Sequence, residues 1–238
     1  MARPMPSFTL ALAFVAFTPA LATAQPDSVP PLPLPFTATG NEPGWRLDVA
    51  NGRITLVADY GSIRLAMPAA EPQSVPGGRR YTGNADGRVL VVTVLLRLCE
   101  DSMTGMPRPH TVEVTMDERL LKGCGGDPAT LLQGGSWTAE AIDGTPVADG
   151  SSVTLSFGAD GRLAGSASCN NYSAAYSLTG EGLTISQAVS TRKACLEPLM
   201  TQEQAVLSLL QSVERFEIAA DGALVLHASG GRTLRARR

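Results

Sequence analysis

Apolar and polar residues alternate along most of the chain from residue 36 onward, a period that is typical of half-buried β-strands. Trp45, Leu47 and Val49 alternate with Arg46 and Asp48 and predict one such strand. The same pattern predicts strands at 54–58, 63–65, 112–116, 153–157, 176–178, 183–185, 216–219 and 224–227. Residues 89–98 are almost all apolar and predict a strand that lies deep in a sheet.

One segment has a helical period instead. Thr201 is expected to cap its start, with Gln204 three residues later in capping-box spacing. The apolar stripe that follows consists of Val206, Leu209, Leu210 and Val213. The chain is therefore predicted to be mainly β, a β-rich α+β protein with a single helix.

Glycine and proline divide the chain into segments. Residues 26–35 hold five prolines, so 25–35 is predicted to be an extended, unpacked linker. The run Gly123–Pro128 predicts a boundary between an N-terminal all-β domain at 36–127 and a second small antiparallel β domain at 131–236. Both lengths suit domains with one core each.

The first 24 residues have the pattern of a signal peptide. Arg3 precedes the short apolar run Phe8–Phe17, and Ala22–Ala24 offers small residues for cleavage. The run is shorter than the roughly 20 residues that a membrane span needs. No cysteine stands at the cleavage point, where Gln25 follows, so no lipid-attachment site is expected. We therefore expect a periplasmic or secreted protein without a stable membrane anchor.

Four cysteines lie in the exported part, at Cys99, Cys124, Cys169 and Cys195. Four cysteines allow three pairings, which sequence alone does not distinguish. Proximity within each predicted domain favours Cys99–Cys124 and Cys169–Cys195.

The formal net charge is −3, with no long run of one sign, which argues against nucleic acid as a partner. The one basic cluster is predicted to be a solvated terminal strand and tail: Arg232, Arg235, Arg237 and Arg238.

The residues around the second cysteine pair are candidates for binding. Asn170 and Asn171 offer two amides to a ligand, or alternatively shape a tight turn. Arg192 is suited to holding a ligand carboxylate, or alternatively lies buried and ties two loops together. In the first domain, Asp101 is expected to accept hydrogen bonds from nearby backbone amides in a turn.

The chain shows no catalytic or metal-binding constellation. His110 and His227 fall in different domains, whereas a zinc site needs three or four ligands at close spacing. Motifs for nucleophilic catalysis or phosphate binding are missing, so we expect no enzyme activity, no metal and no cofactor. Trp45 and Trp137 are predicted to fill the two cores.

Several motifs in the second half occur together in the order found in a known family. They are Gly135–Trp137, Phe157–Arg162, Gly165–Tyr172, Ser190–Cys195 and Pro198–Glu203. By these residues the segment 131–236 resembles the META domain, the family of heat-inducible HslJ-type envelope proteins. The resemblance implies a compact β-rich sheet or barrel with one α-helix. It also implies a link to heat shock and envelope stress, to antibiotic tolerance in some members, and no established enzyme activity. More loosely, the first domain is similar to an uncharacterised envelope-protein module at 38–45, 99–103 and 121–124.

Two functions remain open from the sequence. The first is a non-enzymatic binding or stress-protection protein, which contacts a protein, peptide or envelope component through the surface around Cys169 and Cys195. The alternative is a small β-barrel inhibitor of an envelope-directed hydrolase such as lysozyme, with Gly77–Tyr81 as an exposed loop that enters the enzyme's cleft.

Overall fold

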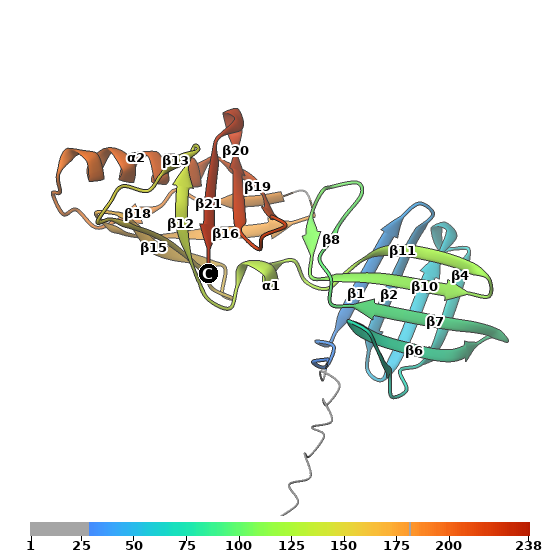
Figure 1. Ribbon diagram of the computed structural model, residues 1–238. Helices are drawn as coiled ribbons and strands as arrows, with labels where there is room; N and C mark the ends of the chain where they lie inside the picture. The colour runs from blue at the N-terminus through green and yellow to red at the C-terminus, as the bar shows by residue number, and fades with distance from the viewer. Residues whose placement is uncertain (1–28, 181) are drawn as a thin grey trace, which may run out of the picture.

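The computed structural model describes residues 29–180 and 182–238, in which two antiparallel sheets and few helices form two bodies side by side (Figure 1). The mainly β prediction is confirmed. The predicted signal peptide and residues 25–28 of the linker lie outside the described residues. The rest of the linker is not unpacked as predicted, because Leu32 packs against the first core and the Val29 carbonyl accepts a hydrogen bond from Arg79.

The first sheet has nine strands in the order β4-β3-β2-β1-β11-β10-β7-β6-β5. The sheet curls, so that β4 approaches β6. A short 3₁₀ turn, η1 (Asp59–Gly61), joins β3 to β4. The strands are β1 Phe36–Asn41, β2 Gly44–Ala50, β3 Arg53–Ala58, β4 Ile63–Pro68, β5 Gln73–Val75, β6 Gly78–Ala85, β7 Arg88–Leu95, β10 His110–Met116 and β11 Arg119–Gly125.

The core of this sheet follows the predicted alternation. Trp45, Leu47 and Val49 of β2 are all buried, and the neighbouring strands bury their own alternate residues against them. The apolar run at 89–98 is only partly buried, since β7 ends at Leu95 and both Val89 and Leu98 are exposed. The apolar run is therefore longer than the strand that it contains.

Two glycines in the predicted boundary belong to the sheet instead. Gly123 and Gly125 lie in β11, which pairs with β1. A Cβ on Gly123 would stand 2.1 Å from the Thr39 carbonyl oxygen, so only glycine allows the strands to approach this closely. The chain leaves the sheet at Gly126, with φ +87°, and enters the short helix α1 (Ala129–Leu132). The first part of the run Gly123–Pro128 thus belongs to β11, and the chain leaves the first sheet within that run.

The second sheet has the path β17-β16-β15-β14-β12-β21-β20-β19, with β13 beside β12 and β18 beside β16. Its ends come together where β17 approaches β19. A 3₁₀ turn, η2 (Ser229–Gly231), joins β20 to β21. The strands are β12 Ser136–Ile142, β13 Thr145–Pro146, β14 Ser152–Phe157, β15 Arg162–Ser168, β16 Asn171–Thr179, β17 Gly182–Ile185, β18 Val189–Ser190, β19 Val213–Ile218, β20 Leu224–Ala228 and β21 Thr233–Arg237.

The helix α2 (Glu197–Gln211) begins four residues before the predicted cap. Thr201 lies inside it, and Pro198 occupies its first turn, where the missing N–H costs no hydrogen bond. Val213 belongs to β19 rather than to the helix. The buried stripe is therefore completed by Val206, Leu209 and Leu210, and α2 packs on β15.

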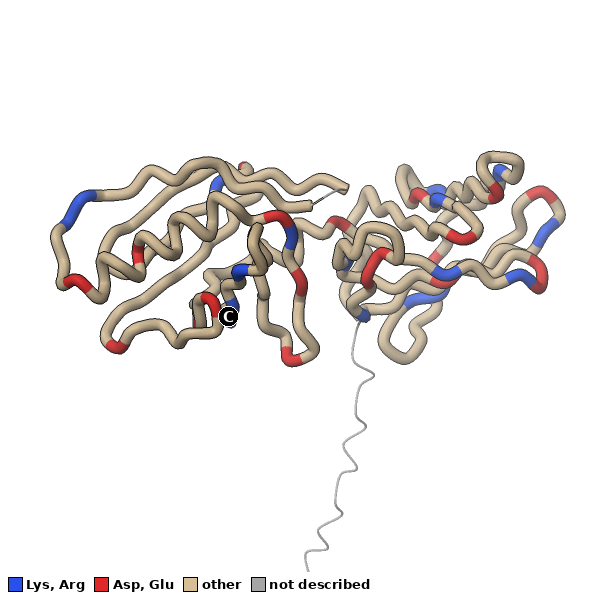
Figure 2. The backbone as a smooth tube through the Cα atoms, turned by 90° about the horizontal axis from the view of Figure 1, so that it is seen from above, with Lys and Arg blue, Asp and Glu red and all other residues tan. Residues whose placement is uncertain are grey.

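The predicted terminal strand is present, because Arg235 and Arg237 lie in β21, but the C-terminal arginines do not form a free solvated tail. β21 lies between β12 and β20, and Arg237 forms ion pairs with Glu140 and Asp221. The guanidinium of Arg238 lies 4.2 Å from the ring centre of Trp137 and donates to the carbonyl of Leu132. Basic and acidic positions are mixed over both sheets (Figure 2).

A third, two-stranded ribbon is formed by β8 (Cys99–Glu100) and β9 (Pro107–Arg108). It rises from the first sheet toward the second (Figure 1).

Candidate functional site

Both favoured disulfides are present. Cys99 pairs with Cys124 and Cys169 with Cys195, with Cα–Cα distances of 5.4 and 6.1 Å. The second bond joins the turn between β15 and β16 to the segment that leads from β18 into α2.

Asn170 is the centre of a hydrogen-bond network beneath this disulfide. Its side chain is buried, and its Oδ1 accepts from Thr191 Oγ1 at 2.7 Å and from the Lys193 N–H at 2.8 Å. Its Nδ2 donates to the Lys193 carbonyl and to the carboxylate of Glu203. Asn170 therefore fixes the turn to the following segment, and its amide is fully engaged inside the protein.

Glu203 is a member of this network that the sequence pattern did not predict. It projects from α2, is buried, and accepts from the backbone N–H and the Nδ2 of Asn170 at 2.9 and 3.1 Å. A signal for it was available in the sequence, because positions 203, 206 and 210 fall on one helix face. A carboxylate on an apolar face requires a buried partner.

The segment from Val189 to Leu196 runs along the surface above this network. Val189 and Leu196 in this segment are 77% and 78% exposed. The prediction that Arg192 is buried is wrong: its side chain is exposed and has no hydrogen bond or ion pair within the described ranges. The backbone is nevertheless fixed, because Thr191 and Asn171 exchange hydrogen bonds.

Asn171 differs from its neighbour in the same turn. Its side chain is exposed, and only its main chain takes part in holding Thr191. The two adjacent asparagines thus have separate positions, one inside the network and one at the surface.

A shallow hollow of about 440 Å³ adjoins the segment on the outer face of the sheet. Small side chains of β16 form its floor, and Val189 and Arg162 stand at its sides. The Arg162 guanidinium has no hydrogen-bond partner in the part of the chain that the structure describes. Asp160 also lines the hollow, so the hollow and the segment together offer apolar, basic and acidic groups on a backbone that is already fixed.

Tyr172 supports the site from inside. Its hydroxyl donates to the Thr154 carbonyl at 3.0 Å, and burial raises the pKa of this phenol well above its usual value. Tyr172 therefore remains neutral at physiological pH and joins β16 to β14.

The other predicted residues fall elsewhere. Trp45 and Trp137 are buried in the two cores, as predicted. Asp101 accepts from the backbone N–H groups of Met103 and Thr104, which confirms the turn.

The loop proposed for a hydrolase inhibitor is not a loop. Only Gly77 lies in a turn, whereas residues 78–81 belong to β6 and the ring of Tyr81 is buried. The predicted exposed loop is therefore wrong.

Within residues 29–180 and 182–238, no three His, Cys, Asp or Glu side chains lie close enough together to hold a metal ion. Among the same residues, no helix has the length and apolar character needed to cross a bilayer.

The comparisons with known proteins agree with the second sheet's motifs. Residues 130–238 match the family model of the META domain, so the C-terminal part of the chain carries a META domain. Comparison with curated proteins gives no match. A protein from Burkholderia xenovorans solved by NMR is 29% identical, with 46% of this chain and 85% of that chain covered and a TM-score of 0.39. A second NMR structure is 24% identical, with coverages of 45% and 92% and the same TM-score.

Proposed function

We propose that this chain is an exported, non-enzymatic binding protein of the bacterial envelope, and that the segment 189–196 is its contact surface. One observation carries the proposal: a fixed, extended segment presents Val189, Arg192 and Leu196 to solvent, and Arg192 is without a partner in the described structure. A surface that is already ordered loses little conformational entropy when a partner binds.

The chemistry of this surface favours an extended peptide segment that carries a carboxylate. Arg192 is suited to a two-pronged hydrogen bond with a carboxylate, and Lys193 adds a second positive charge. The apolar side chains on either side are suited to apolar residues of the same peptide. Through the META domain we further propose that the protein acts during envelope stress, in the way the family resemblance implies.

Binding to defined peptides tests the proposal directly. We expect extended peptides with an acidic centre and apolar flanks to bind the oxidised protein more tightly than otherwise identical peptides with a neutral or basic centre. Arg192→Ala is expected to lower the affinity for the acidic peptide about 10- to 100-fold, which is the usual contribution of a hydrogen bond to a charged group. Arg53→Ala, at an exposed position on the first sheet, is the matched control.

Two results would count against the surface. One is equal binding of acidic and neutral peptides, and the other is equal affinity of Arg192→Ala and Arg53→Ala. Cell fractionation tests the compartment separately, since an exported product is expected in the periplasm or medium, shortened by the predicted signal peptide. Most of the loop that the inhibitor alternative required is part of strand β6. No other feature favours an inhibitor.

A further inference from the structure

The β8–β9 ribbon joins the two halves of the molecule at a second point, besides the chain itself. The ribbon pairs only Cys99 with Arg108 and Glu100 with Pro107. Two residue pairs are too few for a hairpin to be stable alone, so its position must be fixed by outside contacts.

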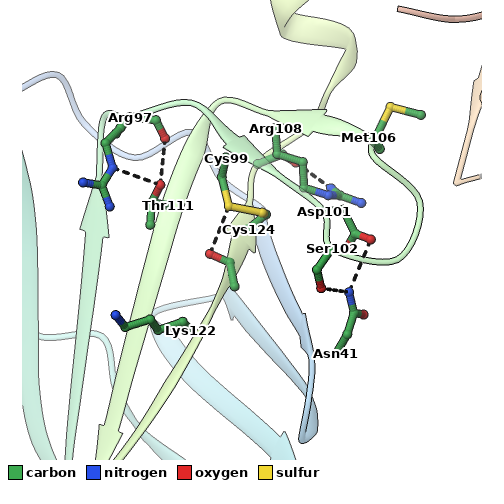
Figure 3. Close-up of a disulfide and its surroundings, with 12 residues drawn as sticks. Asn41, Arg97, Cys99, Asp101, Ser102, Met106, Arg108, Thr111, Lys122 and Cys124 are labelled. Carbon is green, nitrogen blue, oxygen red and sulfur yellow. Dashed lines mark hydrogen bonds between the residues drawn. A yellow bond between two sulfur atoms is a disulfide. The ribbon is translucent and has the colours of Figure 1, made fainter. Parts of the chain in front are cut away.

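Its base is fixed to the first sheet in three ways. Cys99 is bonded to Cys124 of β11, and Asn41 at the end of β1 donates to Ser102 Oγ at 2.9 Å. Arg108 donates to the carbonyl of Gly126 at 2.8 Å. Figure 3 shows these contacts around the disulfide.

Its loop is ordered by one carboxylate. Asp101 Oδ1 accepts from the N–H groups of Met103 and Thr104, both at 3.0 Å, and the Asp101 N–H donates to the Met106 carbonyl at 3.0 Å. These bonds fix the direction in which the loop's two methionines point.

The two methionines have opposite environments. Met103 is 78% exposed, whereas Met106 is only 5% exposed and packs within the apolar core of the second sheet. β9 lies against β19 of that sheet. A residue anchored to the first sheet thus completes the core of the second one.

The disulfide at the base is reachable from the surface. Cys99, Asp101, Ser102 and Lys122 line a hollow of about 280 Å³ beside it. Glu100 also lines this hollow, and the Lys122 side chain is exposed.

We propose that residues 99–108 form a strap that docks the second sheet onto the first, and that Cys99–Cys124 is the latch of this strap. A dithiol reductant opens the latch: the S–S bond breaks, the two cysteines gain two electrons and two protons, and the reductant becomes a disulfide. The strap then loses its covalent base, Met106 withdraws from the second core, and the two sheets move independently about the connection at 126–128, just before α1.

NMR relaxation of the mature, oxidised chain measures whether the two sheets tumble together. We expect one common rotational correlation time for wild type and for Met103→Ala, the matched exposed control. Met106→Ser, with both disulfides intact, and the double variant Cys99→Ala/Cys124→Ala are each expected to give two shorter correlation times, one per sheet. The Cys169→Ala/Cys195→Ala variant, in which Cys99–Cys124 is the one disulfide left for a dithiol to reduce, is expected to resemble the Cys99→Ala/Cys124→Ala variant when it is reduced.

One common correlation time in Met106→Ser would overturn the strap. One common correlation time in a folded Cys99→Ala/Cys124→Ala variant would overturn the latch. If the Cys99→Ala/Cys124→Ala variant does not fold, the reduced Cys169→Ala/Cys195→Ala variant decides on the latch. If the amide signals of the first sheet stay native on reduction and the two sheets keep one common correlation time, the latch is refuted. If those signals collapse on reduction, the disulfide holds the first sheet itself together, and the latch is refuted as well.

Discussion

Replacing Asn170 with alanine is expected to destabilise the second sheet more than any other single change in its turn. The variant loses the two bonds that Oδ1 accepts from Thr191 and Lys193, and the bonds that Nδ2 donates to Lys193 and Glu203. The turn, the segment 191–193 and α2 are then joined only by the disulfide and main-chain contacts.

The magnitude follows from which groups remain without partners. A neutral hydrogen bond contributes about 1 kcal/mol net, and a bond to a charged group about 1.5–3 kcal/mol. Glu203 is 7% exposed and keeps only the Asn170 N–H, so its carboxylate becomes under-bonded inside the protein. Water reaches the exposed side of Lys193 and reduces its loss. We expect a total of about 3–5 kcal/mol, which is a large part of the stability of a small domain.

Denaturant unfolding measures this loss. In a Trp45→Phe background shared by all variants, the fluorescence of Trp137 reports the second sheet alone. Asn171→Ala is the control, because its exposed side chain makes no hydrogen bond that the structure describes, and we expect a change within about 0.5 kcal/mol.

A double-mutant cycle separates the network from general damage to the turn. Asn170→Ala with Glu203→Ala is expected to cost less than the sum of the single changes by about 1–3 kcal/mol, since the buried carboxylate is then gone. A loss in Asn170→Ala below about 1.5 kcal/mol, or strict additivity in the cycle, would refute the reasoning.

Three further outcomes are expected. Cys169→Ala/Cys195→Ala should lower the free energy of unfolding by about 3.5 kcal/mol in the loop-entropy model, because the bond spans 26 residues; an unchanged melting temperature would contradict this. Gly123→Ala should prevent β1 from pairing with β11 through the clash with Thr39, and native hydrogen-exchange protection in β1 would disprove the clash. Burial opposes the ionisation of Asp101, but hydrogen bonds from nearby backbone outweigh it and hold its pKa below the usual value, so its stabilisation is present above about pH 4 and lost as pH falls further. The stability difference between wild type and Asp101→Asn should therefore shrink from pH 6 to pH 2, and a difference that stays constant would contradict this assignment.

The sequence predicted local structure well where one face of a strand is buried. The alternation in β2 was enough to predict this strand, because side-chain period is a local property. Asn51 and Gly52, both with positive φ, form the turn from β2 to β3. The predicted start of α2 is wrong because it relied on the capping-box spacing of Thr201 and Gln204. Pro198, an equally local signal, marks the first turn of the helix in the structure.

Some features of the candidate site were likewise predictable from local sequence, and others were not. Proximity along the chain was enough to favour both disulfide pairs, and the tight turn at Asn170 was among the alternatives. The partner of Asn170 was not predictable, because Glu203 is 33 residues away and meets it only when α2 packs on β15.

The sequence by itself determined the β-rich class and the META resemblance, and it favoured the cysteine pairing without deciding it, since each depends on period, spacing or short motifs. Only the tertiary structure decided which polar side chains are buried together, that Arg192 faces solvent, and that Met106 completes a core on the other sheet. These depend on contacts between segments far apart in the chain. Their formation is governed by packing and by the pairing of buried polar groups, and no local pattern encodes it.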